Sequence, residues 1–233
     1  MKKTLKKALC LALAAVLAAL CCACGDETVK AERTDEGFKV DSTGIEYIPC
    51  GALTLYAVGK GEFYTEITAG KAKETVYTVE FEDPKEYLCV EDEGEFLLYR
   101  SKELGELDIL SFDPIAALIY NNSNRKWIAS FYADDEYLPE DQRGINETQD
   151  TAICKAIADA IANGESVRYN ESELVDTNNY FIRLTSAKYP GLYYLVAFFP
   201  DVNGRFYLRD RGANKTVYCP KEVTARMIGG SVG

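Results

Sequence analysis

Short runs in which hydrophobic and polar residues alternate follow the N-terminal segment of the chain, and they indicate β-strands. These runs are rich in β-branched and aromatic residues, which favour a pleated strand. Four of them occupy residues 53–58, 75–81, 87–90 and 95–99. The acidic segment 91–94 ends in glycine and joins the last two runs, so the sequence predicts a hairpin there. Residues 115–120 and 126–132, which an asparagine-rich segment connects, form a second predicted hairpin.

A single stretch has the period of an amphipathic helix. Residues 150–163 place Ile153, Ile157 and Ile161 on one stripe with alanines around them, and Gly164 stands where a C-terminal cap belongs. A polar, acidic stretch at residues 133–149 precedes this helix and is the best internal break of the chain.

A run of strands then returns after the helix. Residues 192–199 are apolar on both faces, which places this strand in the centre of a sheet. Asp201-Val202-Asn203-Gly204 predicts a hairpin turn, and Pro220 opens a last short helix. The predicted strands of this meander occupy residues 180–185, 192–199, 205–209 and 215–219.

Together these elements predict an α+β fold. It consists mainly of antiparallel β-sheet, with one clear amphipathic helix followed by a C-terminal β-meander. The β-rich segment spans residues 38–132, and the helix with its meander spans residues 145–229. The two segments form either one domain or two.

The first 23 residues have the pattern of a targeting segment. An unbroken apolar run of 13 residues, 8–20, ends in Leu-Cys-Cys-Ala-Cys-Gly, and polar sequence begins at Asp26. Four lysines precede this run: Lys2, Lys3, Lys6 and Lys7.

This segment resembles the signal peptide of bacterial lipoproteins, in which a cysteine after a small residue carries a diacylglyceryl thioether and becomes the mature N-terminus. Cys24 after Ala23 matches that cysteine best. Cys21 and Cys22 depart from the family pattern, which prefers Leu or Val and then Ala or Ser. The resemblance implies a signal peptide at 1–23 and a membrane anchor at Cys24 on the extracytoplasmic face.

An alternative is an ordinary secretory peptide that is cleaved after Ala23 and releases a soluble protein.

If the protein is anchored at Cys24, residues 24–37 suit an acidic tether, because they are charged and have no apolar periodicity. Cleavage before Cys24 leaves 210 residues with 22 basic against 37 acidic side chains, a net charge of −15. An anionic membrane surface repels such a body, so we expect only the lipid to enter the membrane.

Composition excludes several kinds of chemistry. The chain has no histidine, so Ser-His-Asp and Cys-His catalytic arrangements and His-ligated metals are impossible. Its 37 Asp and Glu outweigh its 26 Lys and Arg, which argues against nucleic acid as a partner. Glycine-rich phosphate loops and the nucleophile elbow are absent from the sequence. We therefore expect no catalytic residue, no cofactor and no metal site.

Four cysteines remain in the body after Cys24, namely Cys50, Cys89, Cys154 and Cys219. Outside the cytoplasm they form disulfides or stay as buried thiols, and the sequence leaves both open.

Aromatic residues are frequent in the C-terminal strands, where half-buried strand positions favour them. On one of these strands Arg205, Tyr207 and Arg209 share a face, which is a speculative binding surface.

These observations favour a membrane-anchored lipoprotein whose body is a non-catalytic binding module. The expected ligand is a protein, a peptide or an envelope glycan. The alternative is a hydrolase of the cell envelope that works without histidine, through carboxylates or Tyr and Lys. A substrate-binding lipoprotein of a transporter fits less well, because such proteins usually have two α/β lobes.

Overall fold

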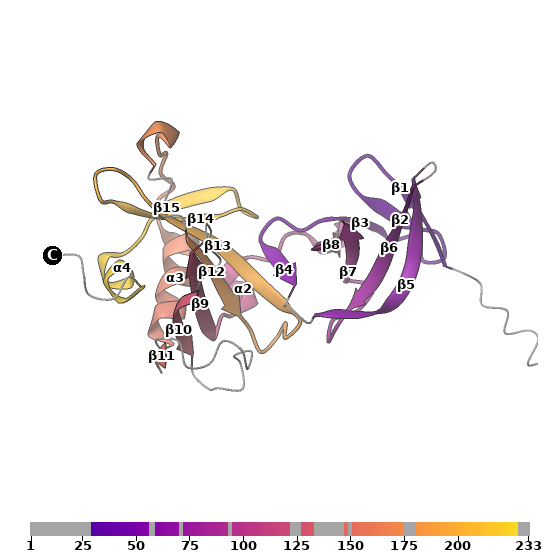
Figure 1. Cartoon of the computed structure of the whole chain (residues 1–233), viewed down its shortest axis with the longest axis horizontal. Helices are drawn as coiled ribbons and strands as arrows, with labels where there is room; N and C mark the ends of the chain where they lie inside the picture. The colour runs from indigo at the N-terminus through magenta and orange to yellow at the C-terminus, as the bar shows by residue number, and fades with distance from the viewer. Residues whose placement is uncertain are drawn as a thin grey trace, which may run out of the picture.

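A computed structural model describes residues 29–55, 59–69, 72–92, 95–121, 127–132, 147–148, 151–174 and 180–227. The predicted signal peptide, Cys24 and nearly all of the predicted break lie outside these residues. Strands hold 48% of the structure and helices 18%. A closed β-barrel and a second sheet form two lobes that lie next to each other (Figure 1). In the described part of the chain, no helix combines the length and apolar character needed to span a membrane.

The barrel closes in the order β1-β2-β3-β8-β7-β6-β5. Neighbouring strands are antiparallel, except that β1 returns parallel to β5 and closes the ring. Phe38, Tyr47, Ile67 and Leu88 are completely buried in its interior. The seven strands are β1 (Lys30–Arg33), β2 (Phe38–Val40), β3 (Glu46–Pro49), β5 (Lys60–Ala69), β6 (Ala72–Val79), β7 (Tyr87–Asp92) and β8 (Glu95–Ser101).

The second sheet has the order β11-β10-β9-β12-β13-β14-β15, and β4 also pairs with β13. Its central strands β12 and β13 are antiparallel to each other and to their neighbours β9 and β14. The eight strands are β4 (Leu53–Leu55), β9 (Ala116–Asn121), β10 (Trp127–Tyr132), β11 (Glu147–Thr148), β12 (Tyr180–Thr185), β13 (Leu192–Pro200), β14 (Phe206–Asp210) and β15 (Lys215–Tyr218).

Helix α3 covers one face of this second sheet. Its stripe of Ile153, Ile157 and Ile161 is buried in the same core as Ile182 and Val196 of the sheet. The stripe forms because residues three and four apart share one side of a helix. The described helices are α2 (Ile109–Phe112), α3 (Ala152–Asn163) and α4 (Lys221–Met227), with 3-10 turns η1 (Lys102–Leu104) and η4 (Glu171–Glu173).

One hydrophobic core extends from the second sheet to strand β7 of the barrel, and the interior of the barrel is a second core. Strand β7 is buried on both faces, because Leu88 fills the barrel while Tyr87 and Cys89 pack in the core that includes the second sheet. A close contact between backbones adds to this joint. A Cβ on Gly191, before β13, would overlap the carbonyl oxygen of Glu80, so only glycine fits there.

Glu82 also ties the lobes together, because its Oε1 accepts a hydrogen bond of 3.3 Å from the Gly191 N–H. Burial raises the pKa of Glu82 to about 7, although the same hydrogen bond opposes the shift. The joint is thus both apolar and sensitive to the charge of one carboxyl group.

Several predicted elements are confirmed. Helix α3 lies within the predicted segment 150–163, and β12 to β15 form the predicted meander. Strands β7 and β8 form the first predicted hairpin, and β9 and β10 form the second. Helix α4 follows Pro220 as expected.

The predicted fold class is wrong. The chain is mostly β, with a closed seven-stranded barrel and a second sheet, rather than an α+β fold built on an open antiparallel sheet. Closure depends on β3 pairing with β8 and on β1 pairing with β5, and neither pair is adjacent in sequence. Residues 30–33, placed by the sequence in the tether, form β1 of this barrel.

Candidate functional site

A covering segment crosses the outer face of the second sheet, opposite α3. This strap, residues 165–174, follows α3 directly and ends in η4. The Val167 N–H donates to the Thr216 carbonyl at 2.8 Å, which fixes the strap at the β15 edge. Farther along, the Tyr169 ring lies 5.1 Å from the ring of Phe199 and 6.0 Å from that of Tyr207. The strap therefore packs through one aromatic side chain.

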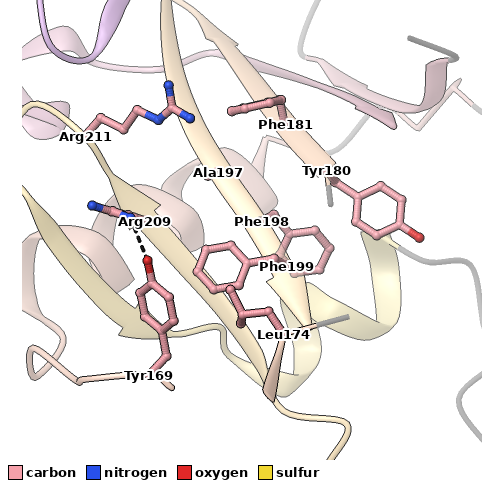
Figure 2. Close-up of a pocket in the computed structure, with 9 residues that line it drawn as sticks. All are labelled: Tyr169, Leu174, Tyr180, Phe181, Ala197, Phe198, Phe199, Arg209 and Arg211. Carbon is pink, nitrogen blue, oxygen red and sulfur yellow. Dashed lines mark hydrogen bonds between the residues drawn. The ribbon is translucent and has the colours of Figure 1, made fainter. Parts of the chain in front are cut away.

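A hollow of about 170 Å³ lies between the strap and the sheet (Figure 2). The strand register places Phe181, Ala197 and Arg209 side by side on β12, β13 and β14. Because Ala197 carries only a methyl group, the larger side chains on each side rise above it and leave a space. In Figure 2, Arg211 and Phe181 lie on one side of Ala197, and Tyr169 and Phe199 lie on the other.

The two arginines of this pocket are held by neutral groups. Arg209 Nη1 donates to the Tyr169 hydroxyl at 2.6 Å, and its Nη2 reaches Asn214 Oδ1 at 3.5 Å. The Arg211 guanidinium lies 5.4 Å from the centre of the Phe181 ring, a cation–π contact. Phe181 in turn stacks on Tyr120 at 5.8 Å. Aromatic contacts thus position both cations without neutralising them.

The two arginines of this pocket differ from several other arginines of the protein in having no paired acid among the described residues. Arg33, Arg100 and Arg205 each form an ion pair with an Asp or Glu. Within the described ranges, neither Arg209 nor Arg211 forms an ion pair with a carboxylate. Two uncompensated guanidinium groups therefore border one hollow in a chain whose net charge is −11.

The structure separates the three residues that the sequence placed on one binding face. Arg205 precedes β14, and its Nε and Nη2 both lie 2.7 Å from Asp201 Oδ2. Tyr207 is buried and donates to the same oxygen at 3.1 Å. Only Arg209 borders the pocket. Arg205 and Tyr207 therefore serve the turn between β13 and β14.

Asp201 is the centre of that turn and is buried. Burial would raise the pKa of its carboxyl group, but hydrogen bonds from the Arg205 backbone, the Arg205 side chain, Tyr207 and Asn203 outweigh it and lower the pKa to about 2. The turn is built around this side chain, since Asp201 Oδ1 accepts the backbone N–H groups of Asn203 and Arg205, both at 2.9 Å.

Sequence reasoning missed Arg211, Phe181, Ala197 and the strap as parts of one site. Arg211 lies two residues after Arg209, so the alternation that places Arg209 outward would have extended to it. No local signal reveals the other members, because only the register of three strands and the path of the strap bring them together.

A larger hollow of about 610 Å³ lies between β15 and α4. Arg205 and Lys221 border it together with Tyr218 and Phe206. Arg205 is already bound to Asp201, so Lys221 alone supplies a charge that no described carboxylate pairs. This hollow is therefore a weaker candidate for an anionic ligand, in spite of its size.

The four body cysteines are thiols rather than disulfides, the first of them half-buried and the others buried. Burial raises the pKa of Cys89 to about 11 and that of Cys219 to about 12, and it also raises the pKa of Cys50. Thiols with such pKa values stay protonated at neutral pH and are weak nucleophiles. They act as small apolar side chains, as the presence of Cys89 and Cys154 in the core illustrates.

Among the residues that the structure describes, no group of three or more Asp, Glu, Cys or His side chains is placed to hold a metal ion. The acidic loop around residue 135 lies outside the described residues.

Comparison of the chain with protein-family models, curated proteins and solved structures finds no match.

Proposed function

We propose that the protein is a lipid-anchored, extracytoplasmic binding protein, and that its pocket between the strap and the second sheet takes an anionic ligand. The lipid is carried by Cys24, at the end of the signal-like segment. The observation that carries the binding function is the pair of guanidinium groups, Arg209 and Arg211, which face the same hollow without a carboxylate partner in the described structure.

The position of the first strand supports a division of roles between the lobes. Lys30, where β1 begins, lies six positions after Cys24 in the chain. A fully extended chain of this length spans roughly 20 Å. The barrel is thus the lobe nearest the membrane, whereas the pocket belongs to the second sheet on the other side of the joint (Figure 1).

Electrostatics supports the same division. The acidic body is repelled by an anionic membrane surface, so a lipid at Cys24 is needed to hold it there. A local positive site in such a body is where an anion experiences attraction rather than repulsion. Arginine suits this role, because its planar fork of N–H donors matches a carboxylate or a phosphate.

The anchor is tested by intact mass of the protein purified from a bacterial membrane fraction. A mass equal to residues 24–233 plus a diacylglyceryl group supports Cys24 as the lipidated residue. Recovery of a soluble, unlipidated protein that begins at or after Cys24 contradicts it and favours the secreted alternative.

The binding function is tested by thermal unfolding of the purified protein with a panel of anions that includes benzoate, glucuronate and inorganic phosphate. A ligand that binds only the folded state raises the unfolding temperature. We expect at least one anion to do so, and Arg211→Gln to abolish the shift. Lys221→Gln is the matched control, because it removes one positive charge from the same lobe outside the pocket. Equal shifts in both variants would reject the site.

A further inference from the structure

We propose that this pocket selects a carboxylate carried by a ring-sized apolar group, attached directly or through one or two carbon atoms. The inference rests on the proposed function, since it names the ligand class of the same site. Three features of the pocket lead to it: its size, the chemistry of its walls and the state of its two guanidinium groups.

The volume of the pocket limits the ligand to one ring. A cavity of about 150 Å³ lined by apolar side chains accommodates benzene, and drug-sized ligands need roughly 300 Å³ or more. The hollow above Ala197 has about 170 Å³. A six-membered ring therefore fills it, and the charged group of the ligand must lie at the rim, where Arg209 and Arg211 are found.

The part of the pocket around Ala197 is apolar, and the polar groups of the lining are the two guanidinium groups and the hydroxyls of Tyr169 and Tyr180. Phe181, Phe199 and Leu174 line this part together with the methyl group of Ala197, and among the described residues no amide or carboxylate side chain lines the space. A sugar ring carries hydroxyl groups that lose their hydrogen bonds to water when they enter such a space. A buried polar group without a partner is unfavourable, so these walls reject a hydroxylated ring and accept an apolar one.

The guanidinium groups retain free donors for a planar anion. An arginine side chain has five N–H donors. Arg209 directs two contacts to Tyr169 and Asn214, and Arg211 donates no hydrogen bond to a described residue. The Arg211 guanidinium also lies within cation–π distance of the Phe181 ring, 5.4 Å from its centre. A ring that enters beside Phe181 brings its carboxylate to this edge, where bidentate contact is possible.

This chemistry has two sources outside a cell. One is a free aryl or cyclic acid, and the other is the C-terminal residue of a peptide that ends in an aromatic amino acid. Benzoate and cyclohexanecarboxylate represent the first source. N-acetylphenylalanine and a short peptide ending in phenylalanine represent the second, and their C-terminal amides provide forms without the charge.

The test measures dissociation constants of these compounds, of glucuronate and of inorganic phosphate by calorimetry with the full protein. We expect the ring carboxylates to bind at least tenfold more tightly than glucuronate, phosphate and the amides. Arg211→Gln should weaken them about tenfold or more. Ala197→Leu should abolish binding, because the larger side chain fills the hollow.

Ala213→Leu is the matched control for this substitution, because it makes the same change at an exposed position of the loop after β14. It should bind like the unaltered protein. Circular dichroism and unfolding temperature report whether each variant is folded. If Ala197→Leu does not fold, Arg211→Gln alone decides, since that side chain is exposed.

The outcomes separate the two proposals. If phosphate or glucuronate binds as tightly as benzoate and responds to the same variants, the anion pocket stands and the ring-carboxylate inference is overturned. If no anion binds, or if Ala197→Leu and Arg211→Gln bind unchanged, both are overturned. If ring carboxylates are preferred, the tighter of benzoate and the phenylalanine peptide identifies the source.

Discussion

Replacement of Tyr194 by phenylalanine tests how the second sheet is stabilised. Tyr194 on β13 is 1% exposed, and its hydroxyl donates a hydrogen bond of 2.6 Å to Oδ2 of Asp210, which is 2% exposed. The other carboxylate oxygen of Asp210 accepts the N–H groups of Gly212 and Ala213 at 2.8 and 3.2 Å. Asp210 therefore fixes the turn after β14, and Tyr194 supplies the side-chain donor that Oδ2 needs in the core.

The size of the effect follows from what Tyr194→Phe leaves behind. The ring stays in place and keeps its contact with Phe112, 5.5 Å away, so packing changes little. The loss is one hydrogen bond to a buried charged group, which is worth about 1.5–3 kcal/mol. For a chain of this size, about 2 kcal/mol lowers the unfolding temperature by about 4–8 °C.

The assay is urea unfolding of the two proteins followed by circular dichroism, with free energies compared at equal slope. Tyr218→Phe is the control, because Tyr218 is 49% exposed and its hydroxyl donates no hydrogen bond to a described residue. We expect it to change the unfolding free energy by less than about 0.5 kcal/mol. A double-mutant cycle with Asp210→Asn isolates the coupling between the two side chains.

A clear result would refute this reasoning. If Tyr194→Phe unfolds with the same free energy as Tyr218→Phe, the hydroxyl does not stabilise the buried carboxylate. A coupling energy near zero in the cycle would show that the loss arises elsewhere. A changed slope of the urea transition would show that the variant alters the unfolded state or the two-state behaviour.

Three further predictions concern the joint and the thiols. The raised pKa of Glu82 means that the folded state holds its proton more tightly than the unfolded chain. The stabilising contribution of Glu82 should therefore be complete below about pH 4.5 and be lost as the pH rises to about 7. Glu82→Gln should flatten this part of a profile of urea midpoint against pH, and an unchanged slope would contradict the prediction. Gly191→Ala should lower the unfolding free energy by about 2 kcal/mol or more in the same urea assay, because its Cβ would overlap the Glu80 carbonyl. A loss below about 0.5 kcal/mol would show that the backbones at this joint move apart to accept the methyl group. Cys89 and Cys154 should resist iodoacetamide until the protein unfolds, which mass spectrometry detects; fast labelling in the native state would refute their burial.

The local elements of this protein could be predicted from its sequence, because each depends on a pattern within a few residues. The isoleucine stripe of α3 and the apolar run of β13 are examples. The barrel could not, because β1 has only four residues and its partner β5 lies more than thirty residues away. The apolar character of β7 on both faces is visible in the sequence, but it does not reveal that one face lies inside a barrel.

The pocket shows the same limit at the level of single side chains. Alternation along β14 correctly places Arg209 outward, yet it also groups Arg209 with Arg205, which Asp201 binds from the neighbouring turn. The hollow exists because Ala197 is small and because the strap places Tyr169 above the sheet. Neither fact has a signature in a single strand, since each depends on which segments the fold brings together.

The shared core links the proposed anchor to the proposed pocket. Tyr87 and Cys89 of the barrel are buried in one cluster with Leu184 and Val196 of the second sheet, so the lobes are packed rather than joined by a linker. A barrel held near the membrane by a short N-terminal segment would therefore also fix the position of the second sheet. The site at Arg211 would then stand beyond the barrel at a fixed distance from the lipid, where a soluble anion can reach it without approaching the membrane surface.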